Sequence, residues 1–521
     1  MADATPPSRA PRLTPDSPLA PGELGRGAVS GVLTMSLGNA GRAVLRVALL
    51  AVLGRLLEPV SFGLVGAAGI VIWFGMIFAG LGVAAALIQR ESLEPRHVAT
   101  AVTSSIALGI LGAGIVYVAA PVLEQALRVP GLTPVLRWLS LVFPIVGVSA
   151  VAECMLQRRL RFGVIAGGEL VSYAVGYGVV GVWLAFAGFG VWALVAAELT
   201  KVAVKALMFL RAVPAARHVA FDPQAFRELM RFGSGYSASS LASYAASQGD
   251  VAVVARTLGP AALGYYGRAF ELMLVPAQSL GIVLDKVLFA AMAKLQDRPD
   301  ALRRAYHRAT ALVALLVLPV SAVTAILAPE IIAVLLGSAW APAAVPLRIL
   351  AAGMYFRVGY MIGHAVANST GATHAAAGRS VVYAALVVVG AVVGVRWGLA
   401  GVATGVLVAV AANFAMVFLL AERITGTRTA DYLALHLAGA RLALLLGGEA
   451  WLIDTAAAAI GIGAIGTLVA SVAVIAITVV ALVRLWPRFL GDDAWWIVDM
   501  LYDHVPTALQ PLVRRTLARS P

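Results

Sequence analysis

The sequence predicts an all-helical membrane protein with many transmembrane segments, on the basis of its composition, the spacing of its apolar stretches and an internal repeat. The chain has 521 residues, of which 61% are hydrophobic and 12% are charged, against roughly 45–50% and about 25% in a soluble domain. Apolar stretches of about 20 residues recur from residue 28 to residue 485, and each is long enough to cross a bilayer as a helix. The alternating segments of about 10 residues that are typical of a transmembrane barrel are not evident.

A ten-residue segment occurs once in each half of the chain. Residues 54–63 read GRLLEPVSFG, and residues 255–264 read ARTLGPAALG. Four residues match at identical spacing, 201 residues apart: Arg55 with Arg256, Leu57 with Leu258, Pro59 with Pro260, and Gly63 with Gly264. Because both copies follow one apolar run and open another, the chain is predicted to contain two related halves. Secondary transporters are often built in this way, with the substrate held where the halves meet.

The apolar pattern predicts about fourteen helices in two six-helix lobes with a further pair at the end. The first lobe, residues 28–210, has helices at 28–53, 59–88, 98–120, 134–156, 163–186 and 188–210. The second lobe, residues 232–421, has helices at 232–255, 260–292, 305–328, 343–368, 376–395 and 398–421. The last pair, at 432–450 and 456–484, occupies residues 422–485.

Three further segments are predicted to lie outside the bilayer. Residues 1–27 are rich in proline and contain no apolar signal-peptide core, which indicates a disordered cytoplasmic leader. Residues 211–231 form a basic linker on the cytoplasmic side, and residues 486–521 combine aromatic and cationic side chains suited to the inner membrane surface.

The charges of the connections predict that both termini are cytoplasmic. Most connections assigned to the cytoplasm carry two or more cations, as in the group Arg158, Arg159 and Arg161. Connections assigned to the other side carry mostly one, such as Arg55 or Arg256. This asymmetry follows the positive-inside rule. The net charge of +13 is therefore spread over loops rather than gathered on a soluble face, so it does not indicate a nucleic-acid partner.

Small residues predict where helices pack closely. Gly390 and Gly394, and likewise Gly401 and Gly405, are four residues apart, which lets helix backbones approach each other. The one cysteine, Cys154, lies in an apolar segment, so an internal disulfide is excluded and thiol or metal chemistry is not expected.

Arg42 and Arg46 are the first candidate binding residues, because charges inside apolar segments are costly and usually face a wet cavity. They lie one turn apart on a helix, so their side chains emerge on one face. One interpretation is that they bind an anionic substrate. The alternative is that they pair with carboxylates of neighbouring helices, for which Glu153 and Glu169 are available.

The same positions in the second half carry hydroxyl groups. The 201-residue offset relates Arg42 to Ser243 and Arg46 to Ser247, and Asp250 follows on the same helical face. A cationic wall is thus predicted to oppose a hydroxyl wall, which suits an anionic group attached to a sugar. Hydrogen bonding of the serines between helices is an equally good interpretation.

Arg268, Glu271 and Arg357 complete the candidate cavity residues. Arg268 and Glu271 are three residues apart and are expected to pair with each other. Arg357 has no acidic partner in its own segment, so it is a candidate to line a cavity in the second lobe.

Catalytic and nucleotide-binding motifs are missing from the sequence. It has no Walker A motif, no HExxH pair and no plausible nucleophile triad. We therefore expect no catalytic residues, no metal and no cofactor, and we expect that the protein is not an enzyme.

Four segments of the chain resemble a known family. They are GRLLEPVSFG at 54–63, GLGVAAALIQRESL at 80–93, QGDVAVVARTLGPAALGYYGRAFELMLVP at 248–276 and LAPEIIAVLLGSAW at 327–340. Over about residues 28–420 the chain resembles bacterial oligosaccharide flippases, of the colanic-acid type, from the polysaccharide transporter branch of the multidrug/oligosaccharidyl-lipid/polysaccharide exporter superfamily.

This resemblance implies a V-shaped bundle in the bacterial inner membrane that works by alternating access. It implies translocation of undecaprenyl-pyrophosphate-linked repeat units for exopolysaccharide or lipopolysaccharide synthesis. The implied partners are the lipid-linked oligosaccharide, membrane lipids, and a polysaccharide polymerase with its export machinery. Two alternatives stay open: a cation-coupled exporter of drugs or peptidoglycan precursors with the same fold, and a membrane glycosyltransferase or polymerase.

Overall fold

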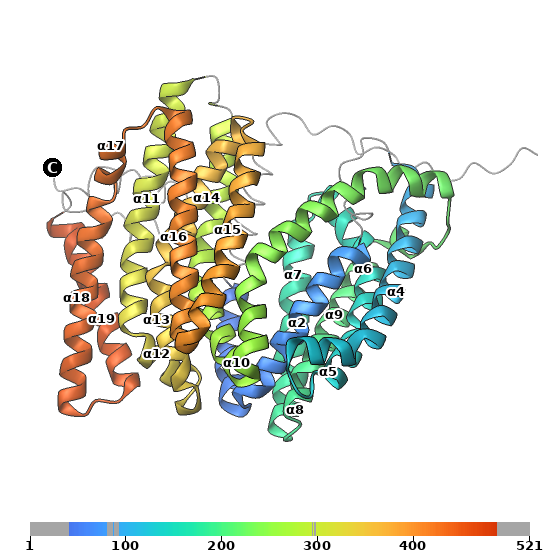
Figure 1. Cartoon of the computed structure of the whole chain (residues 1–521), viewed down its shortest axis with the longest axis horizontal. Coiled ribbons are helices and arrows are strands. Elements are labelled where there is room, and N and C mark those ends of the chain that lie inside the picture. The colour runs from blue at the N-terminus through green and yellow to red at the C-terminus, as the bar shows by residue number, and fades with distance from the viewer. Residues whose placement is uncertain (1–40, 81–86, 88–92, 294, 296–297, 487–521) are drawn as a thin grey trace, which may run out of the picture.

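The computed structural model describes residues 41–80, 87, 93–293, 295 and 298–486. Within these ranges, the side chains of residues 77–80, 215, 231–247, 277–291, 293 and 373–377 are not described. The described part is helical, with helices grouped in two lobes that approach each other at one end, the lower end in Figure 1. We call this end the closed end.

The first lobe begins with a helix over residues 41–56, and the predicted start of that helix lies outside the described residues. It continues with α2 (Pro59–Gly80), α4 (Pro95–Leu127), α5 (Leu132–Leu139), α6 (Val142–Arg158), α7 (Phe162–Tyr173), the π-helical η1 (Ala174–Gly181), α8 (Val182–Phe186) and α9 (Val191–Ala212).

The helix α10 (Pro223–Ala293) joins the lobes. It starts beside α4, arches across the first lobe and descends to the closed end (Figure 1). Its direction changes at Gly259, whose backbone is not helical (φ 84°, ψ 177°). A positive φ is readily adopted only by glycine, which explains why the chain turns there. The two helices predicted at 232–255 and 260–292 are the two arms of α10.

The second lobe continues with α11 (Pro299–Ile326), α12 (Ala328–Leu335), α13 (Ala344–Ala352), α14 (Met354–Ser369), α15 (Thr373–Gly394) and α16 (Gly398–Thr425). The short α17 (Thr429–Ala434) leads into the final pair, α18 (Leu437–Ile460) and α19 (Ala464–Leu485), which lies at the outer side of this lobe (Figure 1). Short 3-10 turns connect some of these helices, among them η3 (Ser338–Ala343).

Two predicted helices are each interrupted by a short break, and one predicted turn was wrong. The segment 134–156 is broken at Ser140 between α5 and α6, and the segment 343–368 is broken at Gly353 between α13 and α14. The last pair turns at 461–463 rather than at 450–456. Glu449 lies inside α18, where its carboxylate accepts a hydrogen bond from Thr478 Oγ1 of α19 at 2.8 Å, so the carboxylate lies between two helices.

The described residues contain nine stretches that are long and apolar enough to cross a membrane. One of them, 378–425, includes parts of two helices, α15 and α16. Nine stretches therefore do not correspond to nine crossings, and fourteen remains a prediction. The protein is a multi-pass membrane protein.

The glycines predicted to allow close packing do so. A Cβ at Gly390 would lie 2.7 Å from the carbonyl oxygen of Gly405, and one at Gly394 would lie 2.2 Å from that of Gly401. These values leave no space for a side chain, so α15 and α16 pack backbone against backbone through these four residues.

The two copies of the sequence repeat contact each other at the closed end. A Cβ at Gly63 would lie 1.7 Å from the carbonyl oxygen of Pro260, and a Cβ at Gly264 would lie 2.1 Å from that of Pro59. Each glycine thus packs on the proline of the other copy. This reciprocity is what two halves related by an approximate two-fold axis would produce.

Candidate substrate-binding site between the lobes

Arg42 and Arg46 project from the helix over residues 41–56 toward different partners. The Nη1 of Arg42 donates to Oε2 of Glu169, on α7 of the same lobe. This is the internal pairing that the sequence offered as the alternative to substrate binding. The other proposed acceptor, Glu153, lies 3.0 Å from Nζ of Lys205 instead.

Arg46 crosses to the other lobe. Its Nε donates to Oε1 of Glu271 on α10 at 2.5 Å. Oε2 of Glu271 forms an ion pair with Nη1 of Arg268, one helical turn earlier, so the contact predicted for Arg268 and Glu271 is present. One carboxylate therefore lies between two guanidinium groups, one from each half of the chain.

The side chains of these ion pairs differ strongly in their exposure to solvent. The Glu271 side chain is 10% exposed, whereas those of Arg42 and Arg46 are 37% and 43% exposed. Among the described side chains, the cluster contains three arginines, Arg42, Arg46 and Arg268, and two carboxylates, Glu169 and Glu271. It therefore carries a net positive charge, and its two first-lobe cations stay accessible.

The second lobe has a different polar arrangement. Asp250 is 2% exposed and its Oδ2 accepts a hydrogen bond of 2.6 Å from the hydroxyl of Tyr266. The ring of Tyr266 stacks on Phe270, with centroids 6.2 Å apart, and the guanidinium of Arg357 lies 4.9 Å from the Phe270 centroid. Asp250 therefore faces a buried tyrosine, and Arg357 lies on an aromatic ring near it.

The candidate residues are thus brought together only in part. Arg46, Arg268 and Glu271 form one cluster, and Arg42 joins it through its neighbour on the helix. Ser243 and Ser247 are on α10, but their side chains fall outside those that the structure describes. The proposed hydroxyl wall therefore stays a prediction.

Two contacts that depend on the fold could not be predicted from the sequence. One links Arg46 to Glu271, which is 225 positions away, and the other links Asp250 to Tyr266. The second pair had a weak signal, because Tyr266 lies in the family-like segment 248–276, but nothing in the spacing indicates that the two arms of α10 place these side chains in contact.

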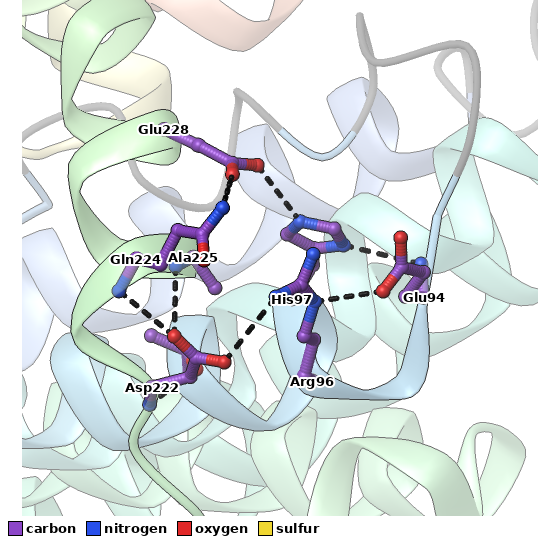
Figure 2. A network of polar contacts seen from close by, with 8 residues as sticks. Glu94, Arg96, His97, Asp222, Gln224, Ala225 and Glu228 are labelled. Atoms are coloured by element: carbon purple, nitrogen blue, oxygen red, sulfur yellow. Dashed lines mark hydrogen bonds and ion pairs between the residues drawn. The ribbon is translucent and has the colours of Figure 1, made fainter.

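A separate polar network attaches the start of α10 to the start of α4 (Figure 2). His97 is fully buried, accepts the N–H of Glu94 at Nδ1 (3.2 Å), and lies 3.1 Å from Glu228 Oε2 through Nε2. Because Nδ1 is an acceptor, the proton of a neutral His97 is on Nε2 and is donated to Glu228.

Asp222 completes this network at the end of the linker. Its Oδ1 accepts the N–H groups of Gln224 at 2.8 Å and Ala225 at 3.1 Å, and Arg96 lies 3.5 Å from its Oδ2. These contacts favour the charged carboxylate, with the N–H of Ala225 contributing most, and they lower the pKa of Asp222. The network fastens the first arm of α10 to the first lobe.

Residues 52–345 match the model of a family described as "Polysaccharide biosynthesis protein". The chain belongs to this family. The match covers the closed end and both arms of α10.

Two bacterial proteins are among those that are similar to this chain. The succinoglycan biosynthesis transport protein ExoT of Rhizobium meliloti (strain 1021) is 30% identical over 304 residues, which is 58% of this chain and 60% of ExoT. The lipopolysaccharide biosynthesis protein WzxC of Escherichia coli (strain K12) is 25% identical over 317 residues, which is 60% of this chain and 64% of WzxC. The chain thus matches somewhat less than two thirds of the length of these relatives.

Solved structures share the fold. The lipid II flippase MurJ in an inward closed conformation has a TM-score of 0.64 and 13% identity, over 82% of this chain and 92% of that one. An inward-facing multidrug resistance MATE family transporter of the MOP superfamily has a TM-score of 0.59 and 18% identity, over 74% of this chain and 95% of that one. The predicted two-lobed exporter fold is therefore confirmed.

Proposed function

We propose that this protein is a flippase that moves lipid-linked oligosaccharide repeat units across the bacterial inner membrane by alternating access. The substrate class is an undecaprenyl-pyrophosphate-linked glycan used for exopolysaccharide or lipopolysaccharide synthesis. Membership of the polysaccharide biosynthesis family supports the pathway, and the names of ExoT and WzxC agree with it. The protein would then act with a polymerase and export machinery and would have no catalytic residues of its own.

The observation that carries the proposal is the accessible arginine cluster at the lobe boundary. The pyrophosphate of such a substrate is esterified at both ends, so it is a compact dianion that guanidinium groups bind through paired hydrogen bonds. Arg42 and Arg46 are each more than a third exposed and already belong to a cluster with excess positive charge. An incoming pyrophosphate would compete with Glu271 for Arg46, and since that ion pair joins the lobes, binding would loosen their contact.

Flipping of a labelled undecaprenyl-pyrophosphate oligosaccharide in proteoliposomes tests this proposal. Arg46→Gln combined with Glu271→Gln removes the pair without leaving a buried carboxylate unpaired, and we expect flipping to fall at least about tenfold, as for the loss of a charge-assisted contact. Lys205→Gln combined with Glu153→Gln is the matched control, because that pair joins α9 to α6 inside one lobe. Equal losses in both variants would contradict the assigned site, and no flipping by the intact protein with several glycans would favour the exporter alternative.

We also infer that the closed end faces away from the cytoplasm and that both termini are cytoplasmic. The distribution of cations among the connections supports this orientation. In a Cys154→Ser background, a cysteine at the exposed Glu58 of the closed end is expected to react with an impermeant maleimide in intact spheroplasts. A cysteine at the exposed Val219 of the linker is expected to react only after lysis, and the reverse pattern would invert the topology.

A further inference from the structure

The repeated arginine makes the same contact in both halves of the molecule. Arg55 of the first half donates from Nη2 to the carbonyl oxygen of Val334, in the second half. Arg256 of the second half donates from Nη1 to the carbonyl oxygen of Ala126, in the first half. Each arginine therefore crosses the boundary between the halves, in opposite directions.

The two acceptors are alike in chemistry, although the 201-residue offset does not relate the helices that carry them. Ala126 is in the last turn of α4, which ends at Leu127, and Val334 is in the last turn of α12, which ends at Leu335. The last carbonyl groups of a helix have no donor within the helix, and they carry the negative end of its dipole. A guanidinium group donates the missing hydrogen bond to such a carbonyl group. Its positive charge also interacts favourably with the negative end of the helix dipole.

A third contact in the same place is made by Trp340, on η3. Its Nε1 donates to the carbonyl oxygen of Gly54 at 2.7 Å, directly before Arg55 in the chain. The indole ring is fully buried and packs edge-on against Phe62 of the first half, with centroids 5.2 Å apart. The Gly63–Pro260 and Gly264–Pro59 contacts lie beside these bonds, because they belong to the same repeat.

We propose that Arg55 and Arg256 are a pair of equivalent gate residues that hold the closed end shut by capping a helix of the opposite half. Their contacts join only main-chain oxygens to exposed side chains, so they break without leaving a buried charge. Opening the closed end requires both to be released, whereas the ion pair of Arg46 belongs to the interior. The role in a transport cycle rests on the proposed function, but the effect on the closed end does not.

Spin-label distance measurements on the purified full-length protein, without substrate, test the gate. In a Cys154→Ser background, labels are placed at Trp138 of α5 and Val345 of α13, two exposed positions on opposite halves. The unsubstituted gate is expected to give one predominant short distance. We expect Arg55→Ala and Arg256→Ala each to raise the ratio of long to short distances by about two- to fivefold, and the double substitution by about tenfold.

Arg348→Ala is the matched control, because Arg348 also donates to a carbonyl oxygen near a helix end, that of Ala325 at 3.2 Å, but within its own half. It is expected to leave the distances unchanged. An unshifted distribution in a monodisperse double variant would overturn the proposal, as would an equal shift with Arg348→Ala.

Trp340→Phe provides a second variant in case the double substitution does not fold, because it keeps an aromatic ring against Phe62 while removing the donor to Gly54. It is expected to shift the distances in the same direction, and a shift toward shorter distances would contradict the gate. These readouts need no substrate, so a protein that fails to flip any glycan still reports on the gate.

Discussion

The two lobes share a scaffold but neutralise their internal polar groups in different ways. The first lobe uses ion pairs between helices, such as Arg42 with Glu169 and Lys205 with Glu153. The second lobe uses hydrogen bonds from tyrosine hydroxyls and aromatic contacts, such as Tyr266 with Asp250 and Tyr355 with His436. The lobes meet at Glu271, which binds one arginine from each half.

The comparison shows which residues the two halves share and at which positions they differ. The repeated arginine, proline and glycine are the residues that touch the other half, and their contacts depend on the backbone. The interior positions carry different chemistry, with arginines at 42 and 46 and serines at 243 and 247. The contacts at the closed end thus use residues that both copies share, while the interiors differ, as the proposed substrate with its anionic and glycan parts would require.

The largest loss of stability is expected at the closed end, where the two copies of the sequence repeat contact each other. Gly63→Ala places a Cβ against the carbonyl oxygen of Pro260, and Gly264→Ala does the same at Pro59. Because a backbone atom cannot move aside alone, we expect each substitution to lower the free energy of unfolding by about 3 kcal/mol. Thermal unfolding followed by size-exclusion chromatography measures this loss.

Gly69→Ala in the same helix α2 is the control, since among the described residues no atom outside the adjacent helical backbone lies within 4 Å of the position that its Cβ would take. It is expected to be neutral or to stabilise by up to about 1 kcal/mol, because alanine favours helices. A clear difference between Gly63→Ala and Gly264→Ala would break the symmetry inferred for the closed end.

The next largest loss of stability is expected at Glu271, where an ion pair joins the two lobes. Glu271→Gln leaves Arg46 and Arg268 without their shared carboxylate, and we expect a loss of about 2 kcal/mol in the free energy of unfolding, reduced from that of a fully buried pair because Arg46 is 43% exposed. Adding Arg46→Gln is expected to restore part of it. A double-mutant cycle with no coupling energy would show that the cross-lobe pair does not stabilise the protein.

A smaller loss is expected in the second lobe. Tyr266→Phe leaves the buried Oδ2 of Asp250 without its donor and is expected to lower the free energy of unfolding by about 1–2 kcal/mol. Asp250→Asn keeps an acceptor for the Tyr266 hydroxyl, so it is expected to cost less. If Asp250→Asn proves more harmful than Tyr266→Phe, the carboxyl group of Asp250 has a role beyond accepting the hydrogen bond of Tyr266.

The scaffold could be predicted from the sequence because helices and close contacts leave local patterns. The apolar periodicity located most helices, the glycines at 390, 394, 401 and 405 marked a backbone contact, and the repeat marked the related halves. Ion pairing was predicted as the favoured interpretation only within one turn, as for Arg268 with Glu271, while the pair of Arg42 with Glu169 was one of two open alternatives. Arg46 had several carboxylates within reach by sequence, and only the packing of α10 against the first helices selects Glu271.

The smallest effect on stability is expected at Asp222, at the end of the linker, where the start of α10 contacts the first lobe. Because contacts with the N–H groups of Ala225 and Gln224 lower the pKa of Asp222, its contribution to stability is complete above the ordinary carboxylate pKa and is lost as the pH falls through the lowered value. The protection factors of residues 222–229, which compare measured hydrogen exchange with the intrinsic rate at the same pH, are therefore expected to fall by about two- to threefold between pH 5 and pH 3, as for a single partly exposed carboxylate.

Asp222→Asn keeps an acceptor at the start of α10 but does not titrate, so it is expected to remove this acid dependence while leaving exchange at neutral pH nearly unchanged. Asp300→Asn is the control, since Asp300 likewise lies at the start of a helix but pairs only with Arg303 of that helix in the described structure. Equal acid sensitivity with and without Asp222 would assign the attachment of α10 to His97 and Glu228 instead.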